Sequence, residues 1–282
     1  MEGLDTGQLA TLASVAVGAG VFGGVLAGLL GVGGGIVIVP ALYLAMSVVG
    51  MDPAITMQVA VGTSLATIVF TSLSSAMGHH KKGAVDYGLL KLWGPSILVG
   101  VLIGAVLGGI VSGLILVAVF AMVAALVAMD MILRKPREET APRSFSRPVW
   151  AGLGVVAGAV SAMMGIGGGT VCVPLLNFLG YDIRRAVGTS AAIGFIIGLP
   201  GAIVYIITGW GAEGLMPFSL GYVNLLAAAV IVPLTMVFAR VGVAIAHSIP
   251  RRALRLAFGV FLALTSARMF ADLWTQLTAM GA

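Results

Sequence analysis

Long stretches of this chain contain no charged side chain, and this feature restricts its fold more than any other. Residues 6–51 contain no Asp, Glu, Lys, Arg or His. About 20 apolar residues cross a bilayer, so such a run holds one helical crossing or, when long, two. Only 9% of the residues are charged, whereas about 25% is typical of soluble domains. Runs without Asp, Glu, Lys and Arg also cover 53–78, 92–129, 149–181, 186–212 and 214–239.

The predicted fold is an all-α polytopic membrane protein with about ten helical segments, of which the glycine-centred ones are interrupted helices or re-entrant hairpins. A transmembrane barrel is excluded because its strands would alternate polar and apolar residues. The polar stretch 134–148 contains three prolines and five basic residues and is predicted to be a cytoplasmic linker. It separates a first transmembrane repeat, 1–133, from a second, 149–282. The ten segments are expected at 10–30, 34–50, 55–78, 87–108, 112–133, 149–164, 167–180, 187–208, 216–240 and 252–274.

The two predicted repeats share four landmarks in the same order, which indicates an internal duplication. Each has a glycine cluster followed by a proline, then a Val-Gly-Thr-Ser motif, then a Gly-x-Val-Asp/Asn motif, then a further proline and glycine. The first-half members are Gly31-Val-Gly-Gly-Gly35 with Pro40, 60–64, 83–86, Pro95 and Gly104. Their counterparts are Gly165-Ile-Gly-Gly-Gly169 with Pro174, 186–190, 221–224, Pro233 and Gly242.

The basic residues predict the orientation of the chain. If the ten segments alternate across the membrane, all of the 15 Lys and Arg except Arg268 lie on one side. The positive-inside rule makes that side cytoplasmic and places both termini outside. Five segments per half is an odd number, so the second half is inverted relative to the first, as in many secondary transporters. Basic residues confined to short loops also argue against a nucleic-acid partner, despite the net charge of +5.

The glycine clusters interrupt apolar runs and are predicted to form a binding site. Irregular backbone at membrane depth must be buried in protein or line a wet cavity. Two such breaks would present helix N-termini, whose free N–H groups and partial positive charge attract an anion. Threonine and serine hydroxyls of the second motif would add donors. The predicted substrate-binding residues are Gly33, Gly34, Gly35, Thr63, Ser64, Gly167, Gly168, Gly169, Thr189 and Ser190. In the alternative interpretation, the glycines only permit close helix packing.

These motifs resemble those of the TauE/SafE sulfite exporter family of membrane permeases. The resemblance lies in Gly28-Leu-Leu-Gly31-Val-Gly-Gly-Gly35 with Pro40, in the second copy from Met164 to Gly169 with Pro174, and in the paired Val-Gly-Thr-Ser segments. It extends over both halves and the linker. It implies transport of a small sulfur oxyanion, such as sulfite, or of an organosulfonate.

The predicted function is therefore a secondary transporter in the bacterial inner membrane that moves such an anion, in the direction of export, by alternating access. No enzymatic activity, metal or cofactor is expected; the partners are the anionic substrate and the lipid bilayer. A selective anion channel is one alternative. A membrane-embedded enzyme of sulfur metabolism is another, and it would depend on Cys172, the single cysteine.

Other polar residues have structural interpretations as well as functional ones. His79 and His80 precede two lysines and are interpreted as part of a cytoplasmic anchor rather than a metal or proton site. Asp130 and Arg268 occupy equivalent places near helix ends, where snorkelling is favoured over ion coupling. Gln58 and Asn177 lie near the glycine breaks and are expected to line the cavity or to bond across helices.

Overall fold

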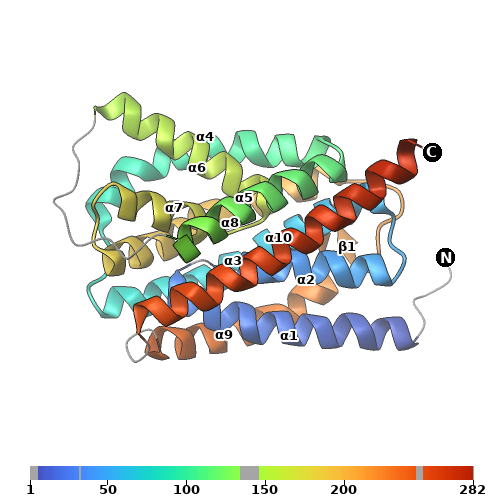
Figure 1. Ribbon diagram of the computed structural model, residues 1–282, viewed down its shortest axis with the longest axis horizontal. Coiled ribbons are helices and arrows are strands. Elements are labelled where there is room, and N and C mark those ends of the chain that lie inside the picture. The colour runs from blue at the N-terminus through green and yellow to red at the C-terminus, as the bar shows by residue number, and fades with distance from the viewer. Residues whose placement is uncertain (1–5, 32, 134–145, 246–249, 282) are drawn as a thin grey trace.

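The computed structural model describes residues 6–31, 33–133, 146–245 and 250–281. Over these ranges the chain forms ten helices and one short β-hairpin (Figure 1). The first five helices are α1 (Thr6–Leu30), α2 (Gly35–Val48), α3 (Pro53–Lys81), α4 (Tyr87–Ile110) and α5 (Gly113–Leu133). The others are α6 (Arg147–Met164), α7 (Gly168–Phe178), α8 (Ile183–Thr208), α9 (Leu225–Ile245) and α10 (Arg251–Gly281), with strands β1 (Ser219–Leu220) and β2 (Val223–Asn224) between α8 and α9.

Seven helices in the described ranges are long and apolar enough to cross a membrane: α1, α3, α4, α5, α6, α8 and α9. This confirms an all-α polytopic membrane protein. Helices α2 and α7 are apolar but have only 14 and 11 residues. At a rise of 1.5 Å per residue they are about 21 and 17 Å long, less than the roughly 30 Å of a hydrocarbon core. Each therefore reaches only part of the way across.

Aspartates begin three of the long helices. The carboxylate of Asp52 accepts a hydrogen bond from the N–H of Ala54 at 2.8 Å, and Pro53 occupies the first turn of α3. Asp86 accepts from Leu89 at 3.0 Å at the start of α4. Asp182 accepts from the N–H groups of Arg184 and Arg185 at the start of α8. Such caps satisfy N–H groups that have no partner inside the helix, so these short polar loops determine where the helices begin.

The start of the ninth helix differs from the prediction. The sequence predicts a segment at 216–240, but α9 begins at Leu225 and extends to Ile245. The residues before it form the antiparallel hairpin of β1 and β2, with Ser219 paired to Asn224. Gly221 has φ 55° in the hairpin turn, a conformation that glycine adopts without penalty. The apolar composition of this stretch favours a helix, but the glycine turn takes precedence and delays the helix start.

In the main helix pairs, a helix from one half packs against a helix from the other half. Helices α1 and α9 lie side by side along one edge of the molecule, and α4 and α6 lie along the opposite edge (Figure 1). Helices α3 and α8 pack against each other between them, and α5 packs against α10. If α1 to α5 correspond in order to α6 to α10, the pair α1–α9 corresponds to the pair α6–α4. The pairs α3–α8 and α5–α10 then each correspond to themselves.

Small residues allow the edge helices to approach closely. A Cβ atom added at Gly100 of α4 would meet the backbone of Val155 in α6, and one added at Gly104 would meet Ala159. The opposite face of α4 carries exposed Leu102 and Ile103. A glycine seam facing a neighbour and an apolar face turned outward are typical of helices in lipid. Gly100 and Gly104 therefore serve close helix packing.

The ends of the helices are arranged as expected for an even number of segments that alternate in direction. Helix α1 begins and α10 ends at the same end of the molecule, whereas α6 and α10 begin at the opposite end (Figure 1). The expected linker, 134–148, lies outside the described residues from 134 to 145. Its last residues, Arg147 and Pro148, belong to the first turn of α6.

Candidate functional site

The two glycine clusters, 134 residues apart in the sequence, meet in the interior of the protein. A Cβ atom added at Gly33 would lie 3.3 Å from the Cα atom of Gly167. One added at Gly35 would collide with the carbonyl oxygen of Gly165, and one added at Gly31 with the carbonyl oxygen of Val187. Glycine is needed here because the backbone of one half occupies the volume that a side chain of the other half would take.

The same clusters begin the two short helices. Helix α2 starts at Gly35 after Gly34, whose φ of 79° is left-handed, and α7 starts at Gly168 after an extended Gly167. All predicted glycine site residues, Gly33, Gly34, Gly35, Gly167, Gly168 and Gly169, are buried. The N–H groups of a first helical turn have no partner within the helix and carry the positive end of its dipole. Two such ends are therefore brought close together in the protein interior.

The hydroxyl of Ser64 connects the halves at this point. Its Oγ donates a hydrogen bond of 2.7 Å to the carbonyl oxygen of Gly165, at the end of α6. The same Oγ is 2.9 Å from the position of a Cβ atom on Gly35. Ser64 thus lies at the glycine junction, as predicted, with its proton already directed to a protein acceptor.

The two predicted threonines form a matched pair of contacts between the halves. Thr63 Oγ1 accepts a hydrogen bond from the N–H of Asn224, and Thr189 Oγ1 accepts one from the N–H of Asp86, both at 2.9 Å. Asn224 and Asp86 occupy corresponding places before α9 and α4. Each also caps its helix, because Asn224 Oδ1 accepts from the N–H of Ala227 and Asp86 accepts from Leu89. The threonines therefore hold the start of a long helix from the opposite half.

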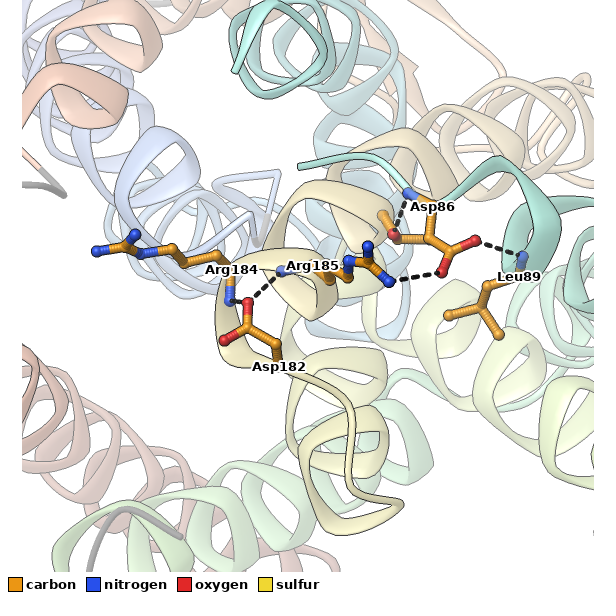
Figure 2. Close-up of polar contacts among 6 residues, drawn as sticks. Asp86, Leu89, Asp182, Arg184 and Arg185 are labelled. Atoms are coloured by element: carbon orange, nitrogen blue, oxygen red, sulfur yellow. Dashed lines mark hydrogen bonds and ion pairs between the residues drawn. The ribbon is translucent and has the colours of Figure 1, made fainter. Parts of the chain in front are cut away.

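Only the contact at Asp86 carries charge. Figure 2 shows the guanidinium group of Arg185 directed toward the Asp86 carboxylate, at 3.9 Å, while Arg184 extends the other way. The side chains of Arg185 and Asp86 are 65% and 25% exposed, so this ion pair contributes at most about 1 kcal/mol to stability. Burial, and then the negative charge of Asp86, raise the pKa of the nearby Tyr181 phenol. At the other contact, the Asn224 amide donates to the Pro217 carbonyl and to Ser219 Oγ.

Comparison with known proteins identifies the family. The profile described as sulfite exporter TauE/SafE matches residues 16–269, which include both glycine clusters and both threonine contacts. The chain belongs to this family. Its relatives carry names of the same class, so it is a multi-pass membrane transporter.

Three curated relatives show how far the TauE/SafE similarity extends. A "Probable membrane transporter protein" of Haemophilus influenzae is 33% identical over 251 residues, covering 89% of this chain and 95% of that protein. YunE of Bacillus subtilis, with the same description, is 29% identical and covers 89% and 94%. MJ0441 of Methanocaldococcus jannaschii, also so described, is 25% identical and covers 85% and 88%. No solved structure matches the chain with statistical significance.

The TauE/SafE chain contains further buried hydroxyls that the sequence motifs do not indicate. Within the part that the structure describes, the hydroxyls of Ser72, Ser161, Thr170, Ser190 and Tyr205 are buried without a hydrogen-bond partner. Of these, only Ser190 belongs to a predicted site motif. The sequence does not single out Ser72, because α3 contains many Ser and Thr residues and periodicity does not show which of their hydroxyls are hydrogen-bonded. Thr71, for example, donates to its own helix and bonds to Thr235 at 2.7 Å.

The remaining polar candidates have structural contacts. Gln58 Nε2 donates to the Val111 carbonyl at 3.0 Å, so this amide bonds across helices. His80 Nδ1 is 2.9 Å from the Tyr87 hydroxyl at the exposed junction of α3 and α4. Cys172 is completely buried in α7. Arg268 forms an ion pair with Asp272 at 3.2 Å, one turn along α10.

Proposed function

We propose that this TauE/SafE protein is a secondary transporter that exports a small sulfur oxyanion or organosulfonate, such as sulfite, across the cytoplasmic membrane by alternating access. The observation that carries the proposal is the junction of the two buried glycine clusters. There the N-termini of α2 and α7, which carry the positive ends of the helix dipoles, lie in the interior of a membrane protein. Such a junction favours an anion over a cation because both helix dipoles present their positive ends.

The chemistry around the junction favours weak, reversible binding. Neither α2 nor α7 contains Lys, Arg or His, and the basic residues of α3 are confined to its last turn. The anion is therefore held by backbone dipoles and hydroxyls rather than by a buried cation. A site without a fixed counter-charge releases its ligand readily, which a transporter requires.

The proposed transport unit consists of two repeats, 1–133 and 149–282, inserted in opposite orientations. This arrangement is supported by the helix packing, because α1 packs on α9 as its counterpart α6 packs on α4. In the proposed topology the linker 134–148 is cytoplasmic and both termini are outside, as the basic residues indicate. An inverted repeat places its two half-helices near the midplane from opposite sides.

Alternating access assigns different roles to the threonine contacts. The bond from Asp86 to Thr189 and the bond from Asn224 to Thr63 each join the two halves. Opening the site to one side requires one contact to break while the other persists. The hydrogen bonds of Thr63 and Thr189 are therefore proposed to act as latches, that is, contacts at the edges of the substrate site that break one at a time. The contact between Thr189 and Asp86 is the cytoplasmic latch, and the ion pair of Asp86 with Arg185 adds charge to it.

Export needs no coupled ion in this scheme. At an inside-negative potential, outward movement of one negative charge is favoured by about 2.3 kcal/mol per 100 mV. The test is flux through proteoliposomes that contain the purified full-length chain, measured for sulfite, sulfate, thiosulfate, sulfoacetate and chloride, with and without a pH gradient. We expect saturable flux of at least one sulfur anion, above that of chloride and dependent on potential. Absence of flux for all four sulfur anions would refute the proposal.

A selective anion channel would use the same glycine junction. The paired threonine contacts favour a transporter because breaking one at a time gives access to one side at a time. Flux rate and counterflow separate the two functions. A transporter accelerates the entry of labelled sulfite when unlabelled sulfite is present on the other side, and a channel does not.

A further inference from the structure

The surroundings of the two short-helix N-termini differ, although the predicted repeats are equivalent. At the α2 end, Ile68 of α3 lies against the glycine cluster, 2.8 Å from a Cβ position on Gly35 and 3.2 Å from one on Gly33. The residue of α8 that corresponds to Ile68 is Gly194, and it lies at the α7 end. The position that Ile68 occupies at one end thus carries no side chain at the other, where Ile193 instead lies 2.8 Å from a Cβ position on Gly168.

A serine hydroxyl lies between the two clusters and reaches this space, because Ser72 Oγ is also 3.3 Å from a Cβ position on Gly33. A Cβ atom added at Gly194 would collide with Ser72 Oγ and would lie 3.8 Å from the backbone nitrogen of Gly168, the first residue of α7. The position that corresponds to Ser72 in the second half is Gly198. Ser72 is completely buried, and its hydroxyl finds no partner among the described residues.

Two more hydroxyls, of residues beside the α7 N-terminus, are also unpaired, whereas one of their first-half counterparts is hydrogen-bonded and the other is apolar. Ser190 is fully buried with no partner in the described part of the chain, whereas the corresponding Ser64 donates to the Gly165 carbonyl. Thr170, in the first turn of α7, is likewise buried and unpaired in the described ranges, and its counterpart in α2 is Ile36. Burying a hydroxyl without a hydrogen bond is unfavourable, so three of them beside one helix N-terminus require an explanation.

We propose that the transported oxyanion is bound asymmetrically, at the N-terminus of α7, where Ser72 and Ser190 donate their hydroxyl protons to its oxygens. The α2 end closes the opposite side with Ile68 and with the carbonyl oxygen of Gly165. This inference rests on the proposed function and deepens it by identifying one anion site in place of two equivalent ones. Ser72 is then a substrate-binding residue that has no counterpart in the second half. Entry of the anion requires α3 and α8 to separate at Ser72 and Gly194, which is the movement that alternating access provides.

The test compares anion affinity with stability in matched serine variants. Ser72→Ala and Ser190→Ala remove hydroxyls that have no protein partner among the described residues. They should lower the affinity for sulfite about tenfold or more, because a hydrogen bond to a charged group is lost, while the Tm of the ligand-free protein stays the same or rises. Ser74→Ala is the control, since Ser74 is buried on the same helix but donates to the Met236 carbonyl at 3.0 Å. It should lower the Tm and leave the affinity unchanged.

Isothermal titration of the purified full-length chain in detergent, with sodium sulfite as the probe and sodium chloride at equal ionic strength as the reference, measures the affinity. Thermal unfolding of the ligand-free protein measures the Tm. If the unmodified protein binds sulfite and both serine variants bind it equally well, the asymmetric site is wrong and the proposed function stands. If the unmodified protein binds none of sulfite, sulfate, thiosulfate and sulfoacetate, the proposed function itself fails. Weaker sulfite binding in Ser72→Ala and Ser190→Ala, with unchanged binding in Ser74→Ala, supports the inference.

Discussion

Thr189 Oγ1 accepts a hydrogen bond of 2.9 Å from the N–H of Asp86, 103 residues away in the sequence. The corresponding contact, from Asn224 to Thr63, has the same length and joins the halves in the reverse sense. Together they show a threonine from each half holding the first turn of a long helix in the other half.

Replacing these threonines by valine should loosen one contact at a time. Thr63→Val leaves the buried N–H of Asn224 without its acceptor, at a loss of about 1–3 kcal/mol, and Thr189→Val should lose less because Asp86 is only partly buried. Hydrogen exchange should accelerate near residue 224 in the first variant and near residue 86 in the second. Thr208→Val is the control, since the Thr208 hydroxyl donates to the Val204 carbonyl of its own helix. Equal exchange at both sites in both variants would contradict separate latches.

Filling the glycine junction should stop transport. Gly35→Ala places a methyl group against the Gly165 carbonyl, which Ser64 also needs as its acceptor. We expect loss of sulfite flux and a reduced Tm, because packed backbone cannot yield as a flexible side chain can. Gly18→Ala in α1 is the matched control, since a Cβ atom there meets no atom within 4 Å and should stabilise the helix by up to about 1 kcal/mol. Normal sulfite flux in Gly35→Ala would indicate that the glycines of the junction serve only helix packing.

The charge and the capping oxygen of Asp86 should have separable effects. Asp86→Asn retains an oxygen for the Leu89 N–H, as Asn224 does for Ala227, and loses only a half-exposed ion pair. We expect a change in unfolding free energy within about 1 kcal/mol. Asp86→Ala also loses the cap and should be less stable than Asp86→Asn by about 1 kcal/mol. Chemical unfolding of the three proteins in detergent measures the difference, and equal stability of both variants would disprove the capping role.

Removing the single thiol should not affect transport. Cys172 is completely buried in α7, and its first-half counterpart is Ile38, which has no thiol chemistry. Cys172→Ala should keep full sulfite flux and lose about 1 kcal/mol of stability or less, through a small cavity. Loss of flux with an unchanged Tm would instead favour the enzyme hypothesis.

The sequence predicts which residues correspond, but the contacts between them depend on the fold. The spacing of the repeated motifs is enough to relate Thr63 to Thr189 and Asp86 to Asn224. It does not indicate that Thr63 meets Asn224, or that α1 packs on α9. Those contacts join residues more than 100 positions apart, and local periodicity carries no information about them.

The apolar runs and the glycines of the sequence predict the helical segments, most of their limits and the two backbone breaks. These are local properties, because the length of an apolar run and the presence of glycine act on the chain around them. Which hydroxyls have a hydrogen-bond partner depends instead on contacts between the two halves. Ser64 and Ser190 occupy the same motif, yet Ser64 bonds to Gly165 and Ser190 is unpaired among the described residues. Whether a buried hydroxyl is satisfied depends on the atoms that the other half brings to it, and for that reason the proposed anion site became visible only in the fold.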